Sequence, residues 1–223
     1  MKESLIMKNN NAHQLNYHFP TLRQRIYFPF KRLFDIILSL LGIILCTTFI
    51  WWWVLFINAF VTKGHPFFTQ KRLGKFGKVF TILKFRSMKN DSNPYLSPFY
   101  MSGKEQYLME TRFGHFLRRS QIDETPQLIN ILFGKMSFVG PRPCMAKNEE
   151  YLVNERKQRN PNPFLVRPGL TGLSQVTIEN MHDPVMKAEI DSFYLKKMTF
   201  WLDFFIILKT LAFIFFKKNK KGM

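Results

Sequence analysis

Two adjacent carboxylates, Asp123 and Glu124, are the residues of this sequence whose types and spacing best suit chemistry. An arginine pair that begins at Arg118 precedes them, and Pro126 opens an apolar run at helical spacing. Proline is tolerated in the first turn of a helix, where its missing N–H would have no partner. We therefore predict a helix start at 123–125, with both acids on the positive end of its dipole.

Such an arrangement has two interpretations. Two carboxylates beside guanidinium groups, on a helix end that attracts anions, suit the binding and transfer of a phosphoryl group with a divalent metal. The alternative is an ordinary helix cap followed by a capping glutamate. Taken alone, so short a motif favours the cap.

Further polar groups follow in two irregular segments. Residues 140–143 read Gly-Pro-Arg-Pro, and the two prolines exclude helix or central strand while holding Arg142 rigidly. A rigid arginine suits bidentate contact with a phosphate, although a plain proline-rich loop is the alternative. The glycine-containing loop 164–176 offers Arg167, Thr171, Ser174 and Gln175 for polar contacts.

The elements around these segments follow from residue patterning. Two short strands, 67–70 and 79–86, are predicted as a hairpin joined by the basic turn 72–78. Lys84 and Arg86 on the second strand are candidates for phosphate contact. The remaining chain reads as a loop at 90–102 and as helices at 105–118, 151–160 and 184–197.

Residues 36–62 contain no charged residue and can cross a bilayer, which takes about 20 helical residues. Basic residues flank the stretch about equally, so the positive-inside rule assigns no orientation. One interpretation is a re-entrant segment, in which the hydroxyls of Thr47 and Thr48 bond freed backbone groups at a bend. The other is a simple span, with the tryptophans at 51–53 near the far interface.

The apolar tail 198–216 differs, because it carries Asp203 and Lys209. A charge at mid-bilayer costs about 2.5–3.5 kcal/mol on insertion scales. We therefore expect a helix that lies at the membrane interface, with lysines facing anionic headgroups.

Composition supports a polyanionic partner. The chain has 33 Lys and Arg against 15 Asp and Glu, a net charge of +18, and is rich in aromatic residues. Nucleic acid, an anionic membrane surface and phosphorylated substrates all satisfy this charge. Cys46 and Cys144 are the sole cysteines, so no disulfide framework is needed and a reducing compartment is expected.

These patterns predict an α+β fold that is predominantly helical. A membrane-inserted helix, re-entrant in one of its two interpretations, precedes a membrane-associated domain with a small β-hairpin and interfacial amphipathic helices. The family resemblance described next implies that this domain is catalytic and cytoplasmic. The predicted boundaries are 1–30 for a flexible basic segment, 31–63 for the membrane-inserted helix, 64–216 for the cytoplasmic catalytic domain and 217–223 for a basic tail.

Six blocks in order resemble the bacterial sugar transferase family, the monotopic polyprenol-phosphate phosphoglycosyl transferases of the small, single-domain type. The similarity covers about residues 30–213. The matching residues are KRLFD (31–35), KFRSM (84–88), LRRSQIDETPQL (117–128), GKMSFVGPRP (134–143), RPGLTGLSQV (167–176) and the spaced Asp191, Tyr194 and Asp203.

The resemblance implies transfer of a sugar 1-phosphate from a UDP-sugar to undecaprenyl phosphate, with release of UMP, at the cytoplasmic face of the bacterial plasma membrane. It implies that Asp123 is a nucleophile that forms a covalent phosphosugar intermediate, and that Asp123 and Glu124 serve Mg²⁺. Arg142 falls on a nucleotide-diphosphate contact. The other substrate-binding positions are Arg118, Lys84, Arg86, Arg167, Thr171 and Gln175.

Two departures from the family pattern stand out. Thr47-Thr48 occupies the place where members often have Ser-Pro, and Lys135 replaces a common acid. A second hypothesis is a membrane-tethered basic protein that binds nucleic acid or acts as a scaffold without catalysis. The Gly-Pro-Arg-Pro block beside the acid pair argues against it, because nucleic-acid binding requires neither. We therefore expect no nucleic-acid partner, while the sequence leaves the oligomeric state open.

Overall fold

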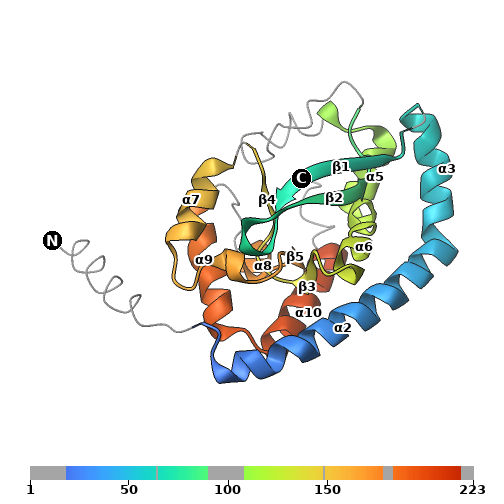
Figure 1. Ribbon diagram of the computed structural model, residues 1–223. Coiled ribbons are helices and arrows are strands. Elements are labelled where there is room, and N and C mark those ends of the chain that lie inside the picture. The colour runs from blue at the N-terminus through green and yellow to red at the C-terminus, as the bar shows by residue number, and fades with distance from the viewer. Residues whose placement is uncertain (1–18, 64, 90–107, 148, 178–182, 217–223) are drawn as a thin grey trace.

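The computed structural model describes residues 19–63, 65–89, 108–147, 149–177 and 183–216 (Figure 1). These residues are predominantly helical and include two small sheets, which confirms the predicted α+β class. The loop predicted at 90–102 lies outside the described residues, as does the beginning of the helix predicted at 105–118.

The predicted hairpin is present. Strand β1 (Phe67–Leu73) pairs antiparallel with β2 (Val79–Phe85), and β4 (Cys144–Met145) pairs with the other side of β1. β1 therefore extends beyond the predicted 67–70, because its last residues have partners on both sides. The turn between β1 and β2 contains a short 3-10 helix, Lys75–Gly77.

A second sheet was not predicted. Strand β3 (Ser137–Val139), which directly precedes the predicted irregular segment 140–143, pairs in parallel with β5 (Gly169–Thr171), which lies inside the predicted loop 164–176. The backbones approach so closely that a Cβ on Gly140 would lie 2.6 Å from the carbonyl oxygen of Arg167. The glycines and prolines that suggested loops instead permit this pairing.

The membrane helix is one long element that begins before the predicted boundary at residue 31. Helix α2 (Leu22–Cys46) continues through a π-helical turn (Thr47–Trp51) into α3 (Trp52–Val61). Thr21 and Gln24 form a capping box that begins α2, a local signal that the sequence interpretation overlooked. The stretch from Leu22 to Val61 is long and apolar enough to cross a bilayer.

The helix bends at the π-helical turn, as Figure 1 shows. Thr47 donates its hydroxyl to the carbonyl oxygens of Ile43 (2.8 Å) and Ile44 (3.0 Å), and Thr48 donates to Ile44 (2.8 Å). Wide turns of this kind leave backbone groups without regular partners. The predicted role of these two hydroxyls at a bend is confirmed.

This helix lies along the rest of the protein and is held to it near both ends. Gln24 donates to the carbonyl oxygen of Leu195 at 2.6 Å, and Asn58 donates to the carbonyl oxygens of Pro66 (2.8 Å) and Arg86 (2.9 Å). Between them, buried Asp35 accepts hydrogen bonds from the hydroxyl of Ser137 and the amide of Phe138 in β3.

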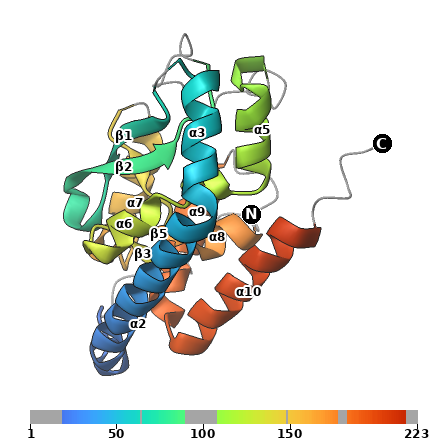
Figure 2. The same ribbon diagram turned by 90° about the vertical axis from the view of Figure 1, so that its right-hand side faces the viewer.

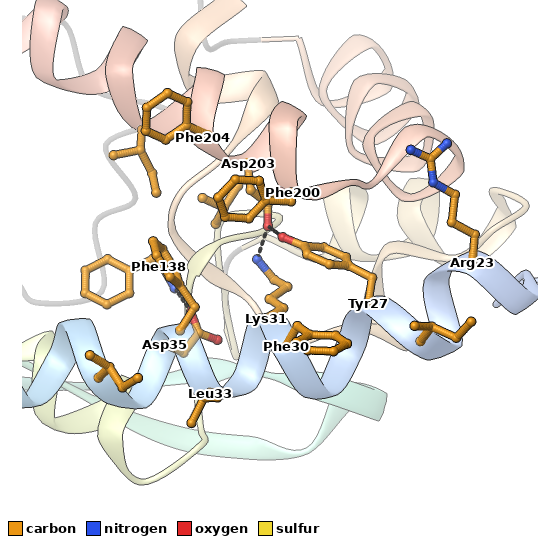
Figure 3. Close-up of a pocket in the computed structure, with 15 residues that line it drawn as sticks. Arg23, Tyr27, Phe30, Lys31, Leu33, Asp35, Phe138, Phe200, Asp203 and Phe204 are labelled. Atoms are coloured by element: carbon orange, nitrogen blue, oxygen red, sulfur yellow. Dashed lines mark hydrogen bonds and ion pairs between the residues drawn. The ribbon is translucent and has the colours of Figure 1, made fainter.

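Helix α10 (Phe200–Phe216) diverges from α2 on the same side of the molecule (Figure 2). Its Asp203 is buried, and Figure 3 shows that it points toward α2. It forms an ion pair with Lys31 and accepts hydrogen bonds from Tyr27 (2.8 Å) and from Tyr194 (2.7 Å) of α9 (Pro184–Lys197). The acid in this apolar helix is thus satisfied inside the protein.

The outer faces of α2, α3 and α10 expose large apolar side chains. An apolar groove of about 520 Å³ lies between α2 and α10. So extended an apolar surface is unusual for a soluble monomer and indicates membrane association. Strongly exposed examples are Phe30, Leu41, Phe49, Trp52, Trp53, Phe60, Trp201, Phe205, Leu208 and Phe213.

Candidate active site

Asp123 and Glu124 lie in a 3-10 turn, Ile122–Glu124, between α5 (Arg112–Arg119) and α6 (Gln127–Leu132). The predicted helix start at 123–125 is therefore wrong, because the α-helix begins at Gln127. The amide of Thr125 closes the turn by donating to the carbonyl oxygen of Ile122 at 3.1 Å. Pro126 then has no N–H to donate, so regular helical bonding starts after it.

Glu124 is engaged by two cations. Its Oε1 accepts a 2.5 Å hydrogen bond from Lys84 Nζ of β2 and lies 3.6 Å from NH2 of Arg142. Burial would raise the pKa of Glu124, but Lys84 and Arg142 outweigh it and hold that pKa at about 2. The structure thus brings Lys84, Glu124 and Arg142 together, as the sequence predicted.

Asp123 has a different environment, although its side chain is next to Glu124. Only 5% of Asp123 is exposed, and no hydrogen bond or ion pair to its carboxylate occurs among the described residues. Burial and the charge of Glu124 raise its pKa to about 6, against the opposing charges of Lys84, Arg118 and Arg142. Asp123 is therefore mostly ionised near neutral pH, with unengaged oxygens.

Arg118 approaches the acids from α5. Its guanidinium donates to Oε1 of Glu110 at 2.8 Å and to the hydroxyl of Ser87 at 3.0 Å. Its charge lowers the pKa of Asp123, so it belongs to the same electrostatic site. Glu110 and Ser87 orient it, and neither was predicted from sequence.

The rigid loop that carries Arg142 is held by two other buried arginines. Arg156 of α7 (Glu150–Gln158) donates to the carbonyl oxygen of Arg142 at 2.8 Å, and Arg72 of β1 donates to that of Pro143 at 3.1 Å. Burial and the charge of Arg142 lower the pKa of Arg72 to about 10.

Asp191 of α9 completes this support. It accepts hydrogen bonds from Nε (3.1 Å) and NH2 (2.5 Å) of Arg156. The sequence interpretation missed Arg72 and Arg156, which it read as part of a hairpin turn and a basic helix end. The proline-rich loop 140–143 was itself a signal for such residues. Its buried carbonyl groups need hydrogen-bond donors, and its prolines have no N–H to donate, so donors from elsewhere in the chain are required.

Three predicted residues make their contacts elsewhere. Arg86 donates to the carbonyl oxygens of residues 65 (3.0 Å) and 67 (3.4 Å) at the start of the hairpin. Arg167 donates to the carbonyl oxygen of Gly134 at 2.7 Å, beyond the C-terminal end of α6, whereas the acids precede its N-terminal end. Thr171 bonds Thr210 of α10 at 2.7 Å.

Gln175, the remaining predicted residue, lies in α8 (Leu173–Thr177). Its Oε1 is buried and has no hydrogen-bond partner among the residues that the structure describes; it would lie 3.4 Å from a Cβ added at Gly172. Its substrate-binding role stays a prediction.

An apolar cluster packs next to the turn that carries the acids. Three members of the cluster are sequence neighbours of site residues: Phe85 follows Lys84, Leu117 precedes Arg118, and Ile122 precedes Asp123. They pack together with the start of α3. Lys84, Arg118 and Asp123 each therefore have a sequence neighbour packed in this cluster. The members contributed by the membrane helix are Ile50, Trp51, Val54 and Leu55.

The donor set fits Mg²⁺ only in part. The described residues contain no group of three or more His, Cys, Asp and Glu side chains that could hold a metal. Asp123 and Glu124 supply two carboxylates, and Lys84 already engages Glu124. Because Mg²⁺ commonly binds one or two carboxylates plus substrate phosphates and water, the pair fits this ion only together with a phosphorylated ligand.

An acid pair surrounded by lysine and arginine, on a fold with an extended apolar face, defines a membrane-associated protein equipped for phosphoryl groups. The sequence profile of the family described as bacterial sugar transferase matches residues 26–217. The chain belongs to this family.

Three similar proteins are all named as transferases of sugars or sugar phosphates. The UDP-glucose:undecaprenyl-phosphate glucose-1-phosphate transferase of Klebsiella pneumoniae is 36% identical over 210 residues, which cover 87% of this chain and 42% of that protein. The undecaprenyl-phosphate galactose phosphotransferase of Salmonella typhimurium is 32% identical over 194 residues, covering 81% and 39%. The sugar transferase EpsL of Bacillus subtilis is 36% identical over 186 residues, covering 81% and 85%. The chain thus spans less than half the length of the first two.

Proposed function

We propose that this protein is a phosphoglycosyl transferase that moves a sugar 1-phosphate from a UDP-sugar to undecaprenyl phosphate and releases UMP. This would be the first step in the assembly of a lipid-linked glycan. The observation that carries the proposal is the buried Asp123, with unengaged oxygens, beside Glu124 and the cations Lys84 and Arg142. Relatives named for glucose and for galactose support the reaction class but leave the sugar open.

The first step is attack by an Asp123 carboxylate oxygen on the phosphorus that bears the sugar. The bond from this phosphorus to the bridging oxygen breaks, and UMP leaves with that oxygen. The result is an aspartyl phosphosugar, a covalent intermediate that divides one difficult transfer into two easier ones.

The second step is attack by a phosphate oxygen of undecaprenyl phosphate on the same phosphorus. The bond to the Asp123 oxygen breaks, which restores the carboxylate and forms the lipid diphosphate sugar. Asp123 must therefore be ionised at the start and must leave again as an anion, and its pKa of about 6 suits both requirements.

Lys84 and Arg142 would neutralise the phosphate oxygens, which carry most of the charge in the transition state. Glu124 holds these two cations in place through its contacts at 2.5 Å and 3.6 Å. Mg²⁺ held by Asp123 and Glu124 would add charge neutralisation on the diphosphate when bound.

We further propose that the bent helix is re-entrant and lies in the cytoplasmic leaflet, with α10 at the interface. Its residues near both ends bond to the same polar domain, through Gln24 and Asn58. This favours both ends on one side of the membrane. The acceptor phosphate, which sits at headgroup level, would then be within reach of the acids.

The experiment is an assay of UMP release. Detergent-solubilised protein is incubated with Mg²⁺, undecaprenyl phosphate and a panel of UDP-sugars. We expect UMP and a lipid-linked sugar from at least one donor, and none without protein. No UMP from any donor, together with salt-sensitive binding of RNA or DNA, would favour the nucleic-acid-binding alternative.

A further inference from the structure

Trp51 differs from the two tryptophans that follow it. Trp52 and Trp53 are 72% and 70% exposed on the outer face of the membrane helix. Trp51, the last residue of the π-helical turn, faces the protein, and its Nε1 donates to the hydroxyl oxygen of Thr125 at 3.0 Å. This bond joins the bend of the membrane helix to the residue that follows Glu124.

Thr125 is itself hydrogen-bonded to the turn that carries the acids. Its hydroxyl donates to the carbonyl oxygen of Ile122 at 2.9 Å, and its amide donates to the same oxygen at 3.1 Å. The indole N–H is a donor only, whereas a hydroxyl donates once and also accepts. The three groups therefore form one directed chain, from Trp51 through Thr125 to Ile122, that closes around Asp123 and Glu124.

The ring of Trp51 also contacts strand β2, which carries Lys84. It packs edge-on against Phe85, with 6.0 Å between centroids and 87° between the planes. Phe85 is 1% exposed and follows Lys84, the partner of Glu124. One side chain at the helix bend thus touches both the turn that carries the acids and the strand that carries their lysine.

We infer that Trp51 and Thr125 are positioning residues, which set the height of the Asp123–Glu124 turn relative to the membrane-embedded helix. The inference rests on the proposed function. The sugar donor is soluble and can reach the acids at any height, whereas the acceptor phosphate is held at the membrane by its lipid. Loss of the hydrogen bond should therefore impair the acceptor step more than the donor step.

The test separates the two half-reactions. Exchange of labelled UMP into the UDP-sugar involves the donor step alone and needs no acceptor, whereas product formation also requires undecaprenyl phosphate. For Thr125→Val we expect kcat/KM for the acceptor to fall about 2- to 10-fold, the range of one neutral hydrogen bond, with UMP exchange nearly unchanged. Thr125→Ser, which retains the hydroxyl, should restore the acceptor reaction.

Trp51→Phe tests the donor of the same bond while keeping an aromatic ring. We expect the loss for the acceptor to match that of Thr125→Val, and the double variant to lose little more, because both substitutions remove one interaction. Trp53→Phe is the matched control, since it removes an exposed indole from the same helix. It should leave both half-reactions unchanged.

Two results would overturn the inference while leaving the proposed function intact. One is an equal loss of UMP exchange and acceptor transfer in Thr125→Val. The other is equal behaviour of Thr125→Val and Thr125→Ser. Absence of UMP exchange in the wild-type protein would instead overturn the proposed function, and this inference with it.

Discussion

At the scale of single residues, the two neighbouring acids are distinguished by their partners. Glu124 is held by Lys84 and faced by Arg142, and its pKa lies at about 2. Asp123 is buried without such bonds, and its pKa is raised to about 6. Environments that separate the pKa values of adjacent carboxylates also separate their roles. This difference supports the proposed roles, in which Asp123 reacts and Glu124 organises the cations.

The first prediction concerns pH. Under the proposed mechanism the ionised form of Asp123 is the nucleophile, so UMP exchange at limiting Mg²⁺ should fall about tenfold per pH unit below about pH 6, the pKa to which burial raises this carboxyl in the metal-free protein. Glu124 stays ionised throughout this range and adds no second step there. The measurement is the initial rate of UMP exchange between pH 4.5 and 8. A midpoint near the ordinary aspartate value, about 4, would contradict it.

The second prediction is that Asp123→Asn abolishes UMP release and leaves membrane association unchanged. The same change should stabilise the metal-free protein, because a raised folded-state pKa means that folding disfavours the charged carboxylate above about pH 4. We expect a gain of the order of 1–3 kcal/mol at pH 8 that disappears at pH 4.

Vesicle flotation, UMP release and thermal unfolding in detergent measure these three effects. Glu124→Gln is the matched control for stability. It should destabilise the protein at pH 8, because the ionised Glu124 is stabilised by Lys84 and Arg142. Near-normal turnover in Asp123→Asn would contradict the proposed mechanism.

At the scale of elements, the site depends on a loop supported from two distant segments. Arg142 lies on a proline-rich turn whose carbonyl groups receive hydrogen bonds from Arg72 of β1 and Arg156 of α7. Arg156 is 2% exposed and is held by Asp191. Helix α7 thus supports the loop that presents Arg142.

The third prediction follows from this support. Arg156→Ala should cost about 3–5 kcal/mol in the free energy of unfolding, because it leaves Asp191 buried without its partner. Arg159→Ala, at the residue that directly follows this helix, is the control. Its pair with Glu155 spans 3.3 Å and is partly exposed, so its loss should cost less than about 1 kcal/mol. Equal unfolding midpoints in denaturant would contradict the prediction.

At the scale of the whole molecule, helices α2 and α10 lie on the same side of the protein (Figure 2), and both expose large apolar side chains. The acids lie beside the helix bend, because Thr125, which follows Glu124, accepts a hydrogen bond from Trp51 of the bend. Buried polar contacts join these two helices to the elements that carry the site residues. Asp35 bonds to β3, which leads into the Arg142 loop, and Asp203 bonds to Lys31 and Tyr194. These contacts join the long apolar helix and α10 to the elements that carry the site.

The fourth prediction is topological. Cysteines introduced as Arg25→Cys and Lys63→Cys should both react with an impermeant thiol reagent from the cytoplasmic side only. The reason is that residues close to each position bond to the same domain. The native Cys46 and Cys144 are buried and give a low background. Labelling of either introduced cysteine from outside would establish a simple span.

Local patterns in the sequence determined the hairpin, the helix at 184–197, the long apolar helix and the two threonine hydroxyls at its bend. Each depends on residues close in the chain, where periodicity and turn chemistry carry the information. The acid pair and Arg142 were also singled out from sequence, although the residues alone favoured a helix cap for the acids and the family resemblance assigned the roles.

Tertiary structure decided which charged side chains meet. Arg86 and Arg167 are as basic as Lys84, yet their hydrogen bonds go to backbone carbonyl groups elsewhere, whereas buried Arg72 and Arg156 support the site. It also decided the β3–β5 pairing, whose three-residue strands are too short to show a period. The reason is the same in each case: a long side chain or a short strand takes its partner from segments distant in sequence, and only packing brings those segments together.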